Sequence, residues 1–351
     1  MFRGDAAAQG VASGRLAKRP EQCWSFSIDG GGFVATAAIE GCVVYVGSTD
    51  GNVYALGLDD GRPRWKFPTK MEFTAPAAVS DRGVFVGDDD GRFYCLEAES
   101  GNQRWYFDAE AEISGGPNFH GPNVLFGSQD GHLYCLDAAT GKLVWKYNSE
   151  DQIRCMPTVV GDRALIAGCD GKLHVIDLKQ GRQVADVPMG SPTGCTPAVL
   201  GDRVFVGTEG GALLAIDWRQ AHTAWEYSTS GQAVRSSAAV SPEAVFVGSR
   251  DKQLHAVNPQ NGKALWRFNT GGQVDCSPVI IGPWVVFGSE DGRLYAVDRK
   301  SGQEAWRYDT GGAIVASPAV ADGRLVIGTE DGDLFCFGPP EQFPKDAEHN
   351  E

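Results

Sequence analysis

Three charged residues recur at one position of a repeated pattern and could bind an ion. Arg154, Arg235 and Asp275 stand at equivalent places in similar stretches of the chain. A pair of guanidinium groups can hold a carboxylate or a phosphate through parallel hydrogen bonds. Arg154 and Arg235 are therefore candidate ligands for an anion, and the alternative interpretation is that all three are ordinary solvated loop charges.

The nine cysteines do not follow a spacing that binds zinc or performs redox chemistry. None belongs to a Cys-x-x-Cys motif, and no two are adjacent in the sequence. Six recur at two positions, in Tyr/Phe-Cys-Leu/Phe contexts or just before an x-Pro step: Cys95, Cys135, Cys336, Cys155, Cys195 and Cys276. This pattern predicts small buried hydrophobic side chains. So many unpaired thiols also favour a reducing compartment.

Other catalytic and metal-binding motifs are absent from the sequence. There is no G-x-S-x-G, no H-E-x-x-H, no Walker A loop and no G-x-G-x-x-G after an expected strand. His174 and His255 take a place held elsewhere by tyrosine, which predicts half-buried strand residues. The run Asp88 to Asp90 lies in one turn, where three carboxylates cannot easily converge on a cation. We therefore predict no metal, no cofactor and no enzymatic activity.

The overall charge narrows the class of partner. The chain has 351 residues, a formal net charge of -14 and a pI near 4.9. Binding to nucleic acid or to anionic lipid needs clustered Lys and Arg, so neither partner is expected. No apolar run reaches the length of a membrane span, and residues 1–20 lack the apolar core of a signal peptide. The sequence predicts a soluble, untargeted monomer.

A repeat of 40 or 41 residues explains the recurring residues. One series aligns on the Asp-Gly turn, which six of the eight units keep, at Asp50, Asp90, Asp130, Asp170, Gly210, Asp251, Asp291 and Asp331. A second marks tryptophans, at Trp65, Trp105, Trp145, Trp225, Trp266 and Trp306, with Ala185 standing in for one and Trp24 preceding the first. The sequence therefore contains eight repeat units.

Each unit contains four short strand patterns separated by turn residues, and no helical periodicity is present. Asp-Gly suits the hairpin between the second and third strands, because glycine tolerates the positive φ of such turns. The last unit lacks its Trp strand, whereas Trp24 supplies a Trp strand ahead of the first unit. We therefore predict an all-β fold: a single eight-bladed β-propeller of four-stranded blades over residues 22–338, its last blade closed by the N-terminal strand. Residues 1–21 form an N-terminal extension and residues 339–351 a polar C-terminal tail.

The tryptophans have two expected roles. Their repetition on the outer strand predicts packing between blades for Trp24, Trp65, Trp105, Trp145, Trp225, Trp266 and Trp306. Trp218 and Trp284 lie outside this series, and either could be an exposed contact residue for a partner. The Asp-Gly hairpins and the links between blades lie on the face where innermost strands begin, and this face is expected to be acidic.

The repeat resembles the PQQ-like, or quinoprotein-type, β-propeller family. The resemblance rests on an A-x-D-x-x-T-G-x-x-x-W phrase, seen as CLDAATGKLVW, AVDRKSGQEAW and AVNPQNGKALW, and on the FRGD opening at residues 2–5. The family has a dehydrogenase branch and a BamB-like scaffold branch. The dehydrogenases use a vicinal Cys-Cys disulfide, which this chain lacks, and long insertions, which its regular units do not provide.

The resemblance implies a non-catalytic, BamB-like scaffold for protein–protein interaction, with other proteins as partners. Two alternatives stay open: a small-ligand sensor that binds an anion at the channel mouth through Arg154 and Arg235, and a PQQ-dependent dehydrogenase-like enzyme. The compartment is undecided, because the family resemblance suggests the bacterial envelope or periplasm whereas the missing signal peptide and the unpaired cysteines suggest the cytoplasm.

Overall fold

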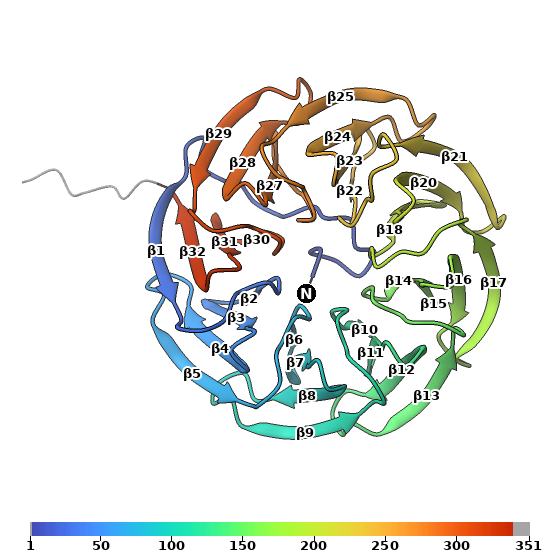
Figure 1. The fold of residues 1–351 in the computed structure, drawn as a ribbon. Coiled ribbons are helices and arrows are strands. Elements are labelled where there is room, and N and C mark those ends of the chain that lie inside the picture. Colours follow the sequence, from blue (N-terminus) through green and yellow to red (C-terminus); the bar gives the residue numbers. More distant parts are fainter. Residues whose placement is uncertain (1, 340–351) are drawn as a thin grey trace, which may run out of the picture.

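The chain forms a closed ring of eight blades around a central axis (Figure 1). The structure, a computed structural model, describes residues 2–339, which contain strands and no helix. Each blade is one four-stranded antiparallel sheet. The predicted all-β, eight-bladed propeller is confirmed. No helix within residues 2–339 has the length and apolarity needed to cross a membrane.

The first four blades follow one another directly along the chain. Blade 1 contains β2 (Ala38–Glu40), β3 (Val43–Gly47), β4 (Asn52–Gly57) and β5 (Pro63–Pro68). Blade 2 contains β6 (Ala78–Ser80), β7 (Gly83–Gly87), β8 (Arg92–Leu96) and β9 (Gln103–Asp108). Blade 3 contains β10 (Asn118–His120), β11 (Asn123–Gly127), β12 (His132–Asp137) and β13 (Leu143–Asn148). Blade 4 contains β14 (Thr158–Val160), β15 (Arg163–Ala167), β16 (Lys172–Asp177) and β17 (Arg182–Pro188).

The remaining blades repeat the arrangement until the last. Blade 5 contains β18 (Ala198–Leu200), β19 (Arg203–Gly207), β20 (Ala212–Asp217) and β21 (His222–Ser228). Blade 6 contains β22 (Ala239–Val240), β23 (Val245–Ser249), β24 (Gln253–Val257) and β25 (Ala264–Asn269). Blade 7 contains β26 (Val279–Ile281), β27 (Trp284–Ser289), β28 (Arg293–Asp298) and β29 (Glu304–Asp309). Blade 8 contains β30 (Ala319–Ala321), β31 (Arg324–Gly328), β32 (Asp333–Gly338) and, as its outer strand, β1 (Glu21–Ser27).

The N-terminal strand closes the ring, as predicted. β1 pairs antiparallel with β32, with Trp24 opposite Cys336 and Ser27 opposite Asp333. Because this pairing supplies the fourth strand of blade 8, it joins the two ends of the repeat array, and the hydrophobic faces of blades 8 and 1 cover one another.

A tryptophan on the outer strand joins each blade to the next at most boundaries. Trp24 Nε1 donates a hydrogen bond to the carbonyl oxygen of Leu58, at 2.8 Å, and Trp145 Nε1 donates to that of Leu178, at 3.0 Å. Trp65, Trp105, Trp225 and Trp266 make the same bond to the next blade. Trp306 packs edge-on against Phe337. These indoles therefore fill the gaps between adjacent sheets.

The boundary between blades 4 and 5 is built differently, which corrects one expectation. Ala185 stands where other blades have tryptophan, and Trp218 of the next blade belongs to the hydrophobic cluster against which Ala185 packs. Trp218 is only 7 % exposed. It is therefore not an exposed contact residue, because its ring supplies apolar volume at the boundary that lacks an outer-strand indole.

Buried hydroxyl and imidazole groups fix the Asp-Gly hairpins. Tyr134 Oη donates to Asp130 Oδ2 at 2.7 Å. In blade 6, His255 Nε2 lies 3.0 Å from Asp251 Oδ2, and its Nδ1 lies 2.9 Å from Tyr227 Oη. His174 lies in the same way against Asp170 and Tyr147. Both histidines are buried rather than half-buried, because the neighbouring blade covers them.

The first part of the N-terminal extension, residues 2–12, lies inside the ring, and the rest runs outward to β1 (Figure 1). The carbonyl oxygens of Ala6, Ala7, Gln9 and Gly10 accept hydrogen bonds from the amides of Val159, Val199, Val240 and Ile280, which lie on the innermost strands of blades 4 to 7. The guanidinium of Arg3 is buried and donates to the carbonyl oxygens of Ala238 and Pro278. The extension thus pairs with strand edges that would otherwise face the channel.

Candidate interaction site at the channel mouth

The innermost strands all begin on one face of the ring, and the residues just before them surround the channel mouth. Arg154, Arg235 and Asp275 lie in these links, ahead of β14, β22 and β26. The hairpins between the second and third strands reach the same face, because the amide of Glu209 bonds to Pro192 and that of Glu290 to Gln273. Links and hairpins together therefore form the rim of the mouth.

An ion-pair network joins blades 5 to 7 at this rim. Asp275 accepts hydrogen bonds from Arg250 Nη2 at 2.7 Å and Nε at 3.1 Å. Arg235 Nε donates to Glu209 Oε1 at 3.0 Å, and its Nη1 lies 4.0 Å from Asp275 Oδ2. The structure therefore brings the predicted residues Arg235 and Asp275 together, but each is already engaged by an opposite charge.

Arg154 stands apart from this network. Its guanidinium donates to the amide oxygen of Gln152, at 2.6 Å from Nη2. Within residues 2–339, Arg154 has no carboxylate at ion-pair distance, whereas Arg235 and Arg250 each form an ion pair. The charge of Arg154 is therefore less compensated than theirs. Arg154 and Arg235 thus have different partners, Gln152 and Glu209, and a joint anion site formed by both stays a prediction.

Carboxylates dominate the rest of the rim. Burial, together with the nearby Asp275 charge, raises the pKa of Glu290 above its usual value. Burial raises the pKa of Glu112 as well, and Asp89 adds to the effect. Burial also raises the pKa of Asp89, although the Thr74 hydroxyl donates a hydrogen bond of 2.7 Å to its carboxylate. Burial is the main cause of the three raised pKa values, and neighbouring carboxylates add to it in each case.

We define the mouth cluster as the rim residues linked by these ion pairs and electrostatic interactions. They are Glu72, Asp89, Glu112, Arg154, Glu209, Arg235, Arg250, Asp275, Glu290 and Glu330. The carboxylates outnumber the guanidiniums. Sequence reasoning identified three of these residues and the acidic character of the hairpins. It missed the pairing of Arg250 with Asp275, because Arg250 occupies a hairpin position that holds a carboxylate in several other blades.

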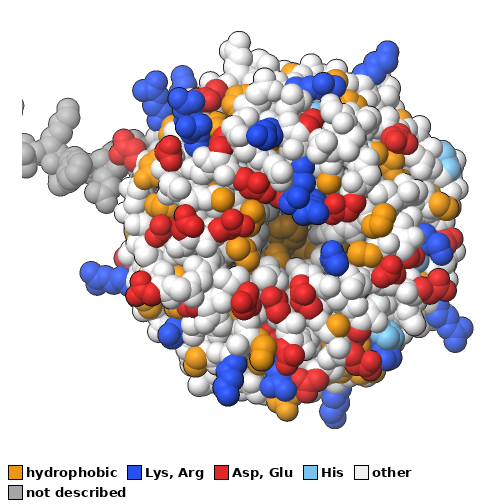
Figure 2. Space-filling view, viewed as in Figure 1, with side chains coloured by type: hydrophobic (Ala, Val, Ile, Leu, Met, Phe, Trp, Pro, Cys, Tyr) orange, Lys and Arg blue, Asp and Glu red, His pale blue; other side chains and the backbone are white. Residues whose placement is uncertain are grey.

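The mouth opens into a hollow at the centre of the ring with hydrophobic side chains at its base and charged ones at its rim (Figure 2). The four residues whose amides bind the N-terminal extension each lie five residues further along the chain than the rim position of the same blade. They are Val159, Val199, Val240 and Ile280. The extension therefore crosses the channel deeper than the mouth cluster. We call this hollow, with the extension below it, the cup.

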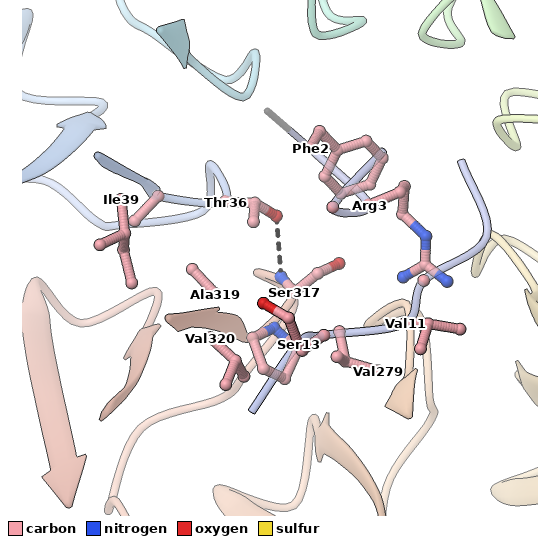
Figure 3. Close-up of a pocket in the computed structure, with 15 residues that line it drawn as sticks. Phe2, Arg3, Val11, Ser13, Thr36, Ile39, Val279, Ser317, Ala319 and Val320 are labelled. Atoms are coloured by element: carbon pink, nitrogen blue, oxygen red, sulfur yellow. Dashed lines mark hydrogen bonds between the residues drawn. The ribbon is translucent and has the colours of Figure 1, made fainter. Parts of the chain in front are cut away.

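A separate cavity of about 220 Å³ lies between the extension and blades 7, 8 and 1 (Figure 3). Its walls include Phe2 and Ser13 of the extension and Ile39 and Val320 of the blades. The Thr36 hydroxyl accepts a hydrogen bond from the Ser317 amide across its edge. Its lining mixes small apolar side chains with the polar residues Arg3, Ser13, Thr36 and Ser317.

Within residues 2–339, the rim provides neither a cluster of metal ligands nor a pair of unengaged guanidiniums for the carboxylates of PQQ. Residues 2–339 contain no cluster of three or more His, Cys, Asp or Glu side chains arranged as metal ligands. Asp88 binds Tyr94 and Asp89 binds Thr74, so the aspartates of that turn point to different partners. A planar tricarboxylate would meet an acidic rim whose Arg235 and Arg250 are already paired.

Trp284, the other candidate contact residue, is half-buried at the start of β27.

The fold and the repeat define the molecule as an eight-bladed PQQ-like β-propeller with an acidic mouth. The family profile described as "Outer membrane protein assembly factor BamB" matches residues 14–113, 95–184, 129–274 and 250–337. The chain belongs to this family. No curated protein matches the chain.

Solved structures share the fold at low sequence identity. BamB from Moraxella catarrhalis is 22% identical, with a TM-score of 0.78 over 94% of this chain and 99% of that one. A europium-containing methanol dehydrogenase is 14% identical, with a TM-score of 0.84 over 96% and 97% of the two chains. The computationally designed Ika8 protein is 17% identical, with a TM-score of 0.77 over 93% and 100%. The ring architecture is therefore common to BamB, a methanol dehydrogenase and a designed protein, and it does not by itself assign an activity.

Proposed function

We propose that this protein is a non-catalytic scaffold that binds another protein at the channel mouth, and that the partner presents a lysine- or arginine-rich segment. The observation that carries the proposal is the excess of carboxylates over guanidiniums in the mouth cluster. A cationic segment would relieve the repulsion among these carboxylates, and such complementarity favours both encounter and register.

The family supports a scaffold that serves protein assembly at the bacterial envelope, because its profile is described as an outer membrane protein assembly factor. The geometry supports the same reading. The mouth is a wide rim built from rigid blades, and the axis below it is occupied by the protein's own residues 2–13. A partner loop can enter the mouth, whereas the extension narrows the way through the ring.

An anion sensor is the second candidate function, and Arg154 is the observation that favours it. Within residues 2–339 its guanidinium donates to the Gln152 amide and forms no ion pair, so it could still bind a carboxylate or a phosphate. The surrounding acidic groups oppose that role. Binding of an anionic ligand that depends on Arg154 would favour the sensor over the scaffold.

The experiment is affinity capture from a native lysate, followed by mass spectrometry, with three matched baits. The wild-type protein is compared with a mouth variant, Glu72→Gln, Asp89→Asn and Glu112→Gln. The control variant carries Glu40→Gln, Asp81→Asn and Glu99→Gln, which are exposed carboxylates at turns on the opposite face of the neighbouring blades 1 and 2. Both variants lose equal charge.

The proposal expects a captured protein with a basic segment that binds the wild type and the control but not the mouth variant. Capture that is equal for all three baits would contradict the assignment of the mouth. Capture that the control variant loses instead would place the interface on the opposite face.

A further inference from the structure

Two cysteines lie together at the seam where the ring closes. Cys23 is on β1 and Cys336 is on β32, so they belong to the first and last strands of the propeller. Gln22 pairs with Phe337 and Trp24 pairs with Cys336, which leaves Cys23 as the extra residue of a β-bulge. In a bulge, two residues of one strand lie opposite a single residue of its partner. Cys23 and Trp24 therefore both lie opposite Cys336.

The side chains of the two cysteines face the same side of the sheet. Cys23 Sγ lies 2.9 Å from the point where a Cβ atom of Gly338 would be, and Gly338 follows Cys336 by two residues on the same face. Cys23 packs against the hydrophobic cluster that contains Cys336. The two thiols are within hydrogen-bonding reach, and burial, with this neighbour, raises the pKa of Cys336 to about 12.

The surroundings distinguish the roles of the two sulfur atoms. Cys336 is fully buried, whereas Cys23 is partly exposed on the outer strand. Arg324 Nη1 lies 3.0 Å from Cys23 Sγ. A guanidinium at this distance stabilises a thiolate, which is the nucleophile of thiol–disulfide exchange. Cys23 is therefore the thiol that an external reagent reaches first.

We propose that Cys23 and Cys336 form a disulfide bond under oxidising conditions and thereby lock the propeller ring covalently. The bond would join β1 to β32 at the seam whose strand pairing closes the ring. In blade 3, the equivalent positions are Val144 and Cys135, and in blade 4 they are Val184 and Val175. The closing seam differs from these blades in carrying a cysteine at both positions.

The reaction requires a disulfide oxidant, such as oxidised glutathione. The Cys23 thiolate attacks one sulfur of the oxidant, forms a mixed disulfide and releases one thiol. The Cys336 sulfur, as its proton leaves, then attacks Cys23 Sγ and releases the second thiol. Two protein thiols thus lose two electrons and two protons, and the oxidant disulfide becomes two thiols.

The test uses the full chain, equilibrated with either oxidised glutathione or a strong reductant. After alkylation in denaturant, peptide mass spectrometry locates the disulfide, and a melting curve reports stability. The proposal expects a peptide that links Cys23 to Cys336 with a loss of about 2 Da, together with a melting temperature several degrees higher than in the reduced protein. Added reductant reverses both changes.

Variants separate the seam from general thiol oxidation. Cys23→Val uses the residue found at this position in blades 3 and 4, and it should remove both the cross-link and the rise in melting temperature. Cys42→Ser changes an exposed cysteine elsewhere and should retain both. Linked peptides that join other cysteines, or a linked seam without a change in melting temperature, would overturn the proposal.

Discussion

The indole of Trp145 lies against Gly181 of the next blade, so closely that a Cβ atom on Gly181 would stand 2.5 Å from Trp145 Cδ2. The same contact joins Trp24 to Gly61 and Trp266 to Gly302. At the boundary between blades 4 and 5 the tryptophan becomes Ala185, and the glycine becomes Ala221. The repeat thus loses its glycine where the indole that requires it is also lost.

Gly181→Ala should destabilise the ring more than Gly201→Ala. Both glycines have a φ of 63°, so either alanine adds the strain of left-handed backbone, about 1–2 kcal/mol. Gly201 has open space around it, whereas Gly181 faces the Trp145 ring, and overpacking adds about 1–3 kcal/mol. Denaturant unfolding of the two variants measures the difference. Equal losses would show that the indole moves aside without cost.

Trp218→Ala should be among the costly substitutions. Trp218 is buried in the cluster shared by blades 4 and 5, where no outer-strand indole is present, so its removal leaves a cavity and costs about 3–5 kcal/mol. Trp284→Ala, at a half-buried tryptophan, serves as the control and should cost less. If hydrogen exchange in residues 164–190 is as fast in the wild type as in Trp218→Ala, Trp218 does not protect this boundary.

The sequence carried enough information for the fold but not for the site. The Trp24 strand and the regular Asp-Gly turns predicted the number of blades and their closure, because a short repeat has few ways to bury both faces of its sheets. Trp218 was misjudged because its burial depends on the absent indole at residue 185 of a different blade. The pairing of Asp275 with Arg250 depends on how a hairpin lies against a link, which spacing alone does not specify.

His255 should make the protein less stable as the pH falls. Burial lowers the pKa of His255 below its usual 6.5, and the folded state therefore holds this imidazole neutral. His255 of the unfolded chain binds a proton near pH 6.5, whereas His255 of the folded protein binds one only at lower pH. The contribution of His255 to the free energy of unfolding is therefore complete above pH 6.5 and is lost as the pH falls below it.

The matched variant for this prediction combines Tyr227→Phe with His255→Tyr, which reproduces the Phe268–Tyr295 pair of the next boundary. Its tyrosine can donate to Asp251 as Tyr295 donates to Asp291, at 2.8 Å. Unfolding free energies measured from pH 7 to pH 5 should fall less steeply in the variant than in the wild type. Parallel curves would mean that His255 is not the titrating group.

PQQ should not bind with saturation, even with excess calcium. The cofactor carries carboxylates, while the mouth cluster is acidic and Arg235 and Arg250 are engaged by Glu209 and Asp275. A weak signal that disappears with added salt reflects screening of loose charge contacts. Calcium-dependent binding at micromolar concentration, together with dye reduction from an alcohol or a sugar, would support the enzyme alternative.

The most direct test of the acidic mouth is a titration of a fluorescent oligolysine peptide, followed by anisotropy at low salt. The account predicts saturable binding to the wild type, and about tenfold weaker binding to the mouth variant, Glu72→Gln, Asp89→Asn and Glu112→Gln, because each lost charge pair removes about 0.5 kcal/mol. The control variant, Glu40→Gln, Asp81→Asn and Glu99→Gln, should bind like the wild type. Equal affinity for all three proteins, or tighter binding of an oligoglutamate peptide, would contradict the proposal that the mouth receives a cationic segment.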